Sequence, residues 1–362
     1  MKEMSNKMKE IPLNERFQIT DGLVERQKNI LTCNKKLTLE LDRLRAECLK
    51  DVNSLIGIQQ LKSYTDLHNE IRAQFLEPRT VFKSESEIER EEKDNRKKLV
   101  TRGQQLVSGL GVDKKKVKGV FKGYIKKANN AFDSYLKPKG EAPYVVADRA
   151  LIPKPEQSPW LWFYPPYFSE FGSVYAYGSR GIYAATHYED HNTGKISTIS
   201  YLEIKGASDS DYAHTDAMSE IMIPAFIIPT SGRVEAWLVL RNDTSDYHGC
   251  MDDEWGWSDI SVKQQSLPYM SIYGSNGGDG TLFDFSKGEC DCCWSGKVSD
   301  ANPGDLRFVH LVSQGGIAAN LWAIISFGIH DNNYAWVNDY SVHMTMTNSW
   351  FVDSVAIRPG VP

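Results

Sequence analysis

Apolar residues recur every three or four positions along the first part of the chain, the spacing of one face of an α-helix. The longest such stripe lies in residues 14–60, and its apolar positions are Ile30, Cys33, Leu37, Leu41, Leu44, Cys48, Val52 and Leu55. The steps fit a straight helix better than the heptads of a left-handed coiled coil. Because such a stripe needs a partner surface, we expect it to pack against another helix or a second copy of the chain.

A second long helix is predicted over residues 113–136, with Asp113 suited to cap its N-terminus. Its apolar stripe consists of Val117, Phe121, Tyr124, Ala128, Phe132 and Tyr135, and seven lysines between residues 114 and 127 cover the rest of its surface. We interpret the lysines as the outer face of a helical bundle. Docking on an acidic partner and binding to an anionic membrane are alternatives. Nucleic acid is not indicated, because no Arg-rich or aromatic-interleaved basic cluster accompanies the lysines.

From Trp160 onward the pattern changes to short runs of alternating apolar and polar residues, which is typical of β-strands. Strands are predicted at 160–164, 173–177, 181–188, 195–204, 221–228, 233–241, 267–273, 281–285, 307–312, 321–329, 341–347 and 350–357. This many strands in one region indicates a large antiparallel β-sandwich or jelly roll. The predicted fold class is therefore α+β with segregated parts, a helical bundle or stalk followed by a β-sandwich.

Charge and aromatic content divide the chain in the same way. Residues 1–145 hold 30 Lys and Arg against 21 Asp and Glu, a net charge of +9, whereas residues 146–362 hold 12 against 26, a net charge of -14. All nine tryptophans lie at or after Trp160, and five of the 15 prolines fall in 137–159. We therefore predict a basic helical domain at 1–136, a proline-rich linker at 137–159 and an acidic β domain at 160–362.

The N-terminal residues lack the apolar segment of a signal peptide, and no run of apolar residues is long enough to span a membrane. The sequence therefore predicts a protein without a transmembrane segment, either cytoplasmic or released without a cleaved signal peptide. Six cysteines are too few for a disulfide scaffold at a length of 362 residues.

Aromatic residues gather at two places in the predicted β domain. On a strand, Trp160, Trp162 and Tyr164 would share one face, which could be an exposed platform for a ligand or a strand of the core. Trp255 and Trp257 lie among acidic residues, where we expect either ligand binding or a calcium site; the alternative is that the acidic loops only keep the surface soluble.

Two further groups are candidates for metal binding. His187, Glu189 and His191 alternate, so all three would point the same way from a strand and could hold a divalent metal. A tetrahedral zinc site could instead be formed by His248, Cys250, Cys290 and Cys293. A disulfide from Cys250 to one of the cysteines at 290–293, or free thiols, are the alternatives. Zinc and calcium are therefore the candidate cofactors.

No motif of a known reaction is present: there is no GxSxG elbow, no phosphate-binding GxxxxGK[ST] and no HExxH. We therefore favour a non-enzymatic binding or assembly protein, whose β part recognises a glycan or a protein surface and whose helices dock or form homo-oligomers. One alternative is a membrane-active toxin with cationic helices and a β receptor-binding head. Another is a metal-dependent enzyme that uses one of the two metal clusters.

Overall fold

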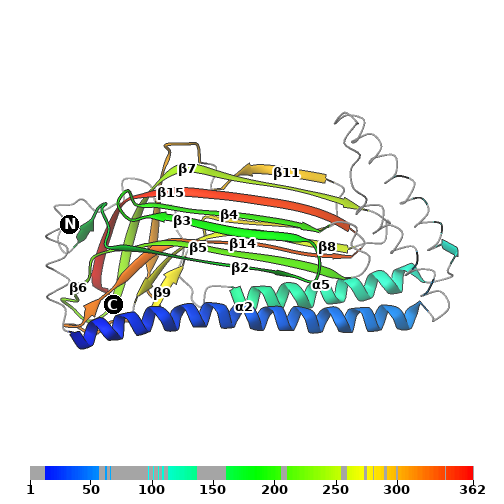
Figure 1. Cartoon of the computed structure of the whole chain (residues 1–362), viewed down its shortest axis with the longest axis horizontal. Helices are drawn as coiled ribbons and strands as arrows, with labels where there is room; N and C mark the ends of the chain where they lie inside the picture. The colour runs from blue at the N-terminus through cyan, green and yellow to red at the C-terminus, as the bar shows by residue number, and fades with distance from the viewer. Residues whose placement is uncertain are drawn as a thin grey trace.

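The computed structural model describes residues 13–56, 113–136, 160–204, 210–253, 259–272, 275–279, 281–288, 292–298, 301–338 and 340–361, together with isolated positions between 62 and 109. The described part is mostly antiparallel β-sheet, with two helices along one side (Figure 1). This agrees with the predicted combination of helices followed by a β region.

Two antiparallel sheets make up the β region. The first, sheet A, has the strand order β11 (Cys292–Lys297), β7 (Arg233–Asp253), β15 (Tyr340–Val361), β4 (Lys195–Ile204), β3 (Ile182–Asp190), with β1 (Leu161–Phe163) beside β15 and β12 (Leu306–Val312) beside β7. The second, sheet B, has the order β10 (Phe283–Lys287), β8 (Asp259–Ile272), β14 (Ile325–Asn338), β5 (Asp211–Met222), β2 (Ser169–Gly178), with β9 (Ser275–Asp279) beside β8. A separate small pair joins β6 (Phe226–Ile227) to β13 (Trp322–Ala323).

The two sheets pack face to face because alternate residues of their long strands are apolar. Leu238 and Trp350 of sheet A share one buried cluster with Met270, Phe327 and Ile329 of sheet B. A second cluster joins the sheets further along the strands, through residues such as Met344 on β15 and Val337 on β14. The core of the protein therefore lies between the sheets, as expected for a sandwich.

A row of polar side chains lies inside this core. The carboxylate of Asp331, on β14, accepts hydrogen bonds from the Thr198 hydroxyl and, at 3.1 Å, from the Asn348 side-chain amide, both on sheet A. All three residues are buried. Burial raises the pKa of Asp331 to about 6, against the opposing effect of hydrogen bonds from Ser266, Thr198 and Asn348. Asp331 therefore ties the two sheets together at the cost of a buried carboxyl group.

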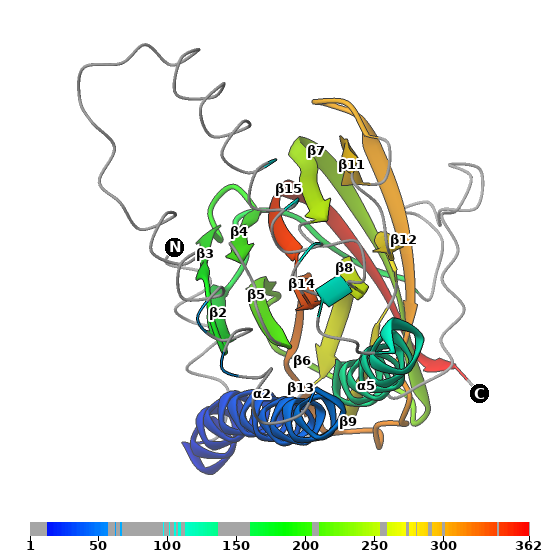
Figure 2. The same cartoon turned by 90° about the vertical axis from the view of Figure 1, so that its right-hand side faces the viewer.

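Helices α2 (Leu13–Leu55) and α5 (Lys114–Leu136) lie side by side on the outer face of sheet B (Figures 1 and 2). The predicted apolar stripes face the sheet, since Leu37, Leu41, Leu44, Cys48, Val52, Val117, Phe121, Tyr124, Ala128 and Phe132 are buried. They pack against Tyr212, Tyr334 and Trp336 of sheet B. The predicted cap is also confirmed, because the Asp113 carboxylate accepts from the backbone N–H groups of Lys115 and Lys116.

Polar contacts fix how α2 lies on the sheet. The Tyr212 hydroxyl donates to Asp42 at 2.8 Å, and Arg45 forms an ion pair with the buried Asp211 at 3.2 Å. Asn34 donates to Asp216 at 3.4 Å. These contacts, added to the apolar stripe, make the helices a third layer of the fold, instead of a bundle with a core of its own within the described residues.

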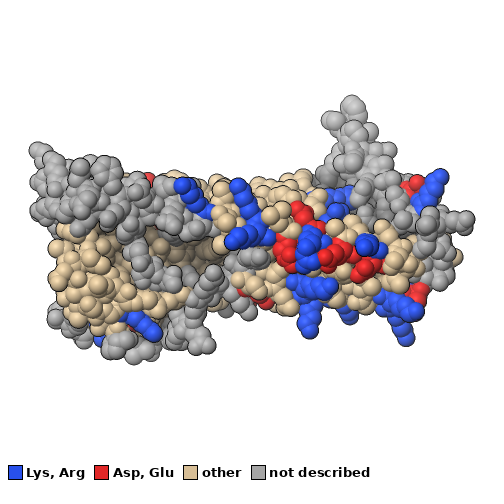
Figure 3. Space-filling view, turned by 90° about the horizontal axis from the view of Figure 1, so that it is seen from below, with Lys and Arg blue, Asp and Glu red and all other residues tan. Residues whose placement is uncertain are grey.

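The charge contrast along the chain agrees with the Arg45–Asp211 ion pair of α2 but not with the ion pair of α5. The ion pair between α5 and sheet B has Asp133 on the helix and Lys263 on the strand, the reverse of the average charges of the two regions. The exposed Lys114, Lys115 and Lys116 lie on the outward side of α5. Figure 3 shows positive side chains standing along the helical face of the molecule, beside the acidic side chains there.

The predicted boundaries at 1–136, 137–159 and 160–362 stay a prediction, because residues 137–159 lie outside the described part. Neither described helix combines the length and the apolar character that crossing a membrane requires.

Candidate functional site

Alternation along β1 separates the aromatic residues that follow Trp160. Phe163 points inward and packs against the core, with its ring 5.7 Å from that of Phe226. Trp162 and Tyr164 point to the outer face of sheet A, and their nearly parallel rings lie 6.1 Å apart. The predicted shared face is therefore present on β1, and the 52% exposed Tyr164 lies at its open end.

Three neighbouring strands extend this aromatic face across sheet A. Trp162 on β1 is opposite Ala356 on β15, Ala356 is opposite Trp237 on β7, and Trp237 is opposite His310 on β12. The Trp237 and His310 rings stack with centroids 4.4 Å apart. Because Ala356 is small, the larger side chains on either side of it can pack over the same spot.

The complete set forms one cluster, which we call the aromatic surface. It comprises Trp160, Trp162, Tyr164, Trp237, Phe308 and His310, with Ala356 at its centre. Trp237 forms the base and is only 8% exposed, whereas Trp160, Trp162 and Phe308 are partly exposed above it. The surface therefore offers indole and phenol rings that are held in place from below.

Charged groups lie within the aromatic surface. One Glu235 oxygen lies 2.8 Å from Nε2 of His310, and the other accepts a hydrogen bond from Arg358. The Arg358 guanidinium in turn lies 5.1 Å from the centroid of the Trp160 ring. Burial alone would raise the pKa of Glu235, but hydrogen bonds from His310 and Arg358 outweigh it, so this pKa lies below its ordinary value. Glu235 is therefore a carboxylate at neutral pH, balanced by Arg358.

This arrangement suits binding by stacking. Indole and phenol rings pack on flat apolar faces, including the C–H faces of sugar rings, while charged groups at their edge orient hydroxyl groups by hydrogen bonds. The second predicted aromatic pair, Trp255 and Trp257, lies outside the described residues, and ligand binding there stays a prediction.

The three residues predicted as a metal set separate into two pairs. Nδ1 of His187 lies 2.8 Å from Glu189, and both side chains fill the space left by Gly172 on the facing strand β2. His191 lies in the turn after β3, where its Nδ1 is 2.5 Å from Glu170 of β2. His187 and Glu189 therefore point into the interior at the edge of the sandwich. His191 instead contacts Glu170, a residue that the sequence pattern did not indicate.

In the described residues, Glu170, Asp190 and His191 form a group of possible metal ligands, whose ligand atoms lie within 4.8 Å of one another. Hydrogen bonds already engage these side chains, since Asp190 accepts from Thr193 and from the Asn192 backbone, and Glu170 accepts from the His191 backbone. These hydrogen bonds stabilise the turn after β3 and attach it to β2, which explains why the three side chains lie together. Zinc or calcium binding stays a prediction that metal analysis of the purified protein would test.

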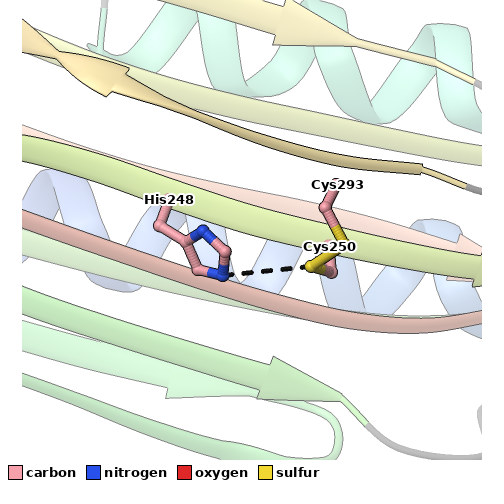
Figure 4. The surroundings of a disulfide bond; sticks show 3 residues. All are labelled: His248, Cys250 and Cys293. Carbon is pink, nitrogen blue, oxygen red and sulfur yellow. Dashed lines mark hydrogen bonds between the residues drawn. A yellow bond between two sulfur atoms is a disulfide. The ribbon is translucent and has the colours of Figure 1, made fainter.

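The cysteines of β7 and β11 form a disulfide, which was one of the alternatives to a zinc site. Cys250 and Cys293 are directly opposite each other and form a disulfide (Figure 4). Cys292 is disulfide-bonded as well. His248 lies beside this disulfide, with Nε2 3.9 Å from the Cys250 sulfur. A zinc site requires free thiolates, so the zinc hypothesis for His248, Cys250, Cys290 and Cys293 applies only to a reduced chain. Cys290 lies outside the described residues.

The acidic segment between β7 and β8 gives no further information. The side chains of Asp252 and Asp253 and all of residues 254–258 lie outside the described part. Calcium binding by this segment stays a prediction.

The apolar face of α5, which a membrane-active helix would insert into a bilayer, is buried inside the protein. Val117, Phe121 and Phe132 are buried against α2 and sheet B, so the lysine side is the one left outside. A shallow hollow of about 550 Å³ lies between this helix and β8, lined by residues such as Lys122, Lys126 and Lys263.

Comparison with known proteins gives only distant likenesses. No known protein family and no curated protein matches the chain. The enzymatically active domain of tailspike protein 4 from bacteriophage CBA120 is 9% identical, over 49% of this chain and 19% of that chain, with a TM-score of 0.14. The K1 cleaved adhesin domain of Lys-gingipain from Porphyromonas gingivalis W83 is 11% identical, over 52% of this chain and 99% of that chain, with a TM-score of 0.14.

A third structure, TmCBM61 in complex with β-1,4-galactotriose, is 7% identical over 44% of this chain and 86% of that chain, with a TM-score of 0.12. The chain spans about a fifth of the tailspike domain it matches. Likenesses of this size carry no argument about function, which has to come from the site itself.

Proposed function

We propose that this is a non-enzymatic binding protein whose aromatic surface on sheet A holds a glycan. The observation that supports this is the grouping of Trp160, Trp162 and Tyr164 around the buried base of Trp237. Aromatic rings that are fixed from below lose little conformational freedom when a ligand stacks on them, so the ordering cost of binding is small.

The charged groups favour a neutral sugar over an acidic one. Glu235 and Arg358 balance each other, so the surface has no surplus positive charge for a carboxylate or a sulfate. In this proposal Arg358 donates to sugar hydroxyls and Glu235 accepts from them, and His310 adds a third polar side chain at the same place. A protein surface as ligand is the other form of this proposal, and would use the same rings as anchors.

In this proposal the helices serve the binding sheet indirectly. Helices α2 and α5 bury the outer face of sheet B (Figure 2), whereas the aromatic surface lies on the outer face of sheet A with its rings partly exposed. The docking function predicted for the helical region is then carried out within the chain itself.

Replacing both outward rings of the aromatic surface should abolish most binding. We expect the double variant Trp162→Ala/Tyr164→Ala to weaken a bound glycan roughly 10- to 100-fold, since each lost stacking contact costs on the order of 1 kcal/mol. A glycan array identifies the ligand, and isothermal titration calorimetry with the best glycan measures the loss.

Ile199→Ala is the matched control, because Ile199 is similarly exposed on the outer face of sheet A but lies on β4, away from the aromatic surface. It should bind like the unchanged protein. If no glycan and no protein partner binds the unchanged chain, or if the control loses binding as much as the double variant, the proposal is wrong.

A further inference from the structure

Strand β3 ends sheet A on one side. It pairs with β4 through nine consecutive residues, from Ile182 opposite Glu203 to Asp190 opposite Lys195, without a bulge. Among the described residues no strand pairs with its other side. The backbone N–H and C=O groups on that side form a long, regular row that another strand could join.

Strand β3 lacks most of the devices that protect such an edge, and the inward-pointing Glu189 is the one that it has. Natural edge strands are shielded by proline, by lysine, by bulges or by shortness, and Ile182–Asp190 contains no proline or lysine. Its outward side chains are exposed, with Ile182 at 62% and Tyr188 at 56%. A long, regular edge with exposed apolar side chains indicates that a partner covers it.

The strand is complementary to itself in the antiparallel direction. If Thr186 faces Thr186 of a second copy, small residues come opposite large ones on both faces. Ala184 then faces Tyr188 on the outer side, and Ala185 faces His187 on the inner side. The carboxylates at the end of β3 also avoid each other, because Glu189 comes opposite Tyr183 and Asp190 comes opposite Ile182.

We infer that β3 is a homodimer edge, at which two copies of this chain join their A sheets into one continuous antiparallel sheet with a two-fold axis through Thr186. This symmetry is of the isologous kind, in which the same strand serves on both sides. In this pairing the outer-face side chains of one copy lie next to the outer-face side chains of the other. The two-fold axis is therefore perpendicular to the sheet. Both aromatic surfaces then lie on the same side of the dimer.

A second copy fits this edge better than an unrelated extended peptide for two reasons. The small-to-large complementarity about Thr186 involves both faces of the strand. The position of Glu189 and Asp190 at one end, away from the axis, also keeps the like charges of two antiparallel copies apart.

Thr186→Lys tests the inference, because the two-fold axis would bring the new lysine opposite its own copy. We expect the unchanged protein to sediment as a dimer. Thr186→Lys should raise the dissociation constant of the dimer roughly tenfold or more. An equimolar mixture of Thr186→Lys and Thr186→Glu should form a heterodimer again. Analytical ultracentrifugation of the full chain over a concentration series measures all three.

Thr347→Lys is the matched control, since Thr347 lies in the same row of the outer face but on the interior strand β15. It should remain a dimer. Thr186→Cys gives an independent measurement, as a pair of cysteines across the axis should form a disulfide between copies under mild oxidation, whereas Thr347→Cys should not. A protein that is monomeric throughout, or a dimer that Thr186→Lys leaves intact and Thr186→Cys does not cross-link, would overturn the inference.

Discussion

Replacing Phe132 with alanine is expected to destabilise the whole protein by about 3–5 kcal/mol, the usual cost of removing a fully buried phenylalanine. The Phe132 ring lies between α5 and sheet B, where it stacks on Tyr334 with centroids 4.6 Å apart. Its edge contact with His214 is at 5.6 Å. Alanine would leave a cavity at the centre of the helix–sheet interface and would admit water next to His214, an imidazole whose pKa burial lowers.

Urea unfolding measured by both far-UV circular dichroism and tryptophan fluorescence checks this expectation. Lys126→Ala, on the outward side of the same helix, is the control and should change the stability by less than about 0.5 kcal/mol. The two signals should shift together in the Phe132 variant. If only a helical transition shifts while the β-sheet unfolds as before, the helices form an independent domain, as the sequence boundaries at 1–136 and 160–362 predict.

The second large effect concerns pH and Asp331. Its folded pKa of about 6 lies above the unfolded value of 3.8, so the folded state holds the proton more tightly. The resulting stabilisation is complete below pH 3.8 and is lost as the pH rises through about 6. A difference of about two pH units corresponds to up to about 3 kcal/mol.

Asp331→Asn keeps the shape of the side chain without the buried charge. We expect this variant to lose that part of the pH dependence, and to be more stable than the unchanged protein above pH 7. Urea unfolding on both sides of the folded pKa measures the difference. Asp246→Asn, at an exposed position on β7, is the control and should keep the slope of the unchanged protein. Parallel pH curves for all three proteins would contradict the assignment.

Local patterns were enough to predict the helices. The apolar stripe of α5 and its Asp113 cap are confirmed, because both depend only on residues that are close in sequence. On α2 the stripe ends at the buried Ile56, whereas the predicted Leu55 is 38% exposed. The surface that the stripes cover could not be predicted, since Tyr212, Tyr334 and Trp336 belong to strands far along the chain.

Strand β5 shows why some of the sheet was missed. Only its last residues fall within the predicted strand 221–228, although β5 runs from Asp211 to Met222. Every residue of β5 is buried, because one face meets the core and the other lies toward the helices. Polar residues such as His214 and Asp216 are buried there with partners from other elements, so the alternation that marks a half-exposed strand is absent.

The aromatic surface could be predicted in part. Alternation correctly placed Trp160, Trp162 and Tyr164 on one face, but a strand pattern contains no information about its neighbours in a sheet. Trp237 and His310 join the surface through the pairing of β1, β15, β7 and β12. The one indication in the sequence was alternation along the predicted strand 307–312, which implies that Phe308 and His310 share a face.

The layered order of helices, sheet B and sheet A has a practical consequence for handling the protein. The exposed lysines of α5, including Lys114, Lys115, Lys116, Lys126 and Lys127, all lie on the layer furthest from the aromatic surface. Amine-coupling reagents applied to a sensor chip or a bead would therefore attach many molecules through the lysines of α5. Those molecules would be immobilised in a shared orientation, with the aromatic surface directed into the solution.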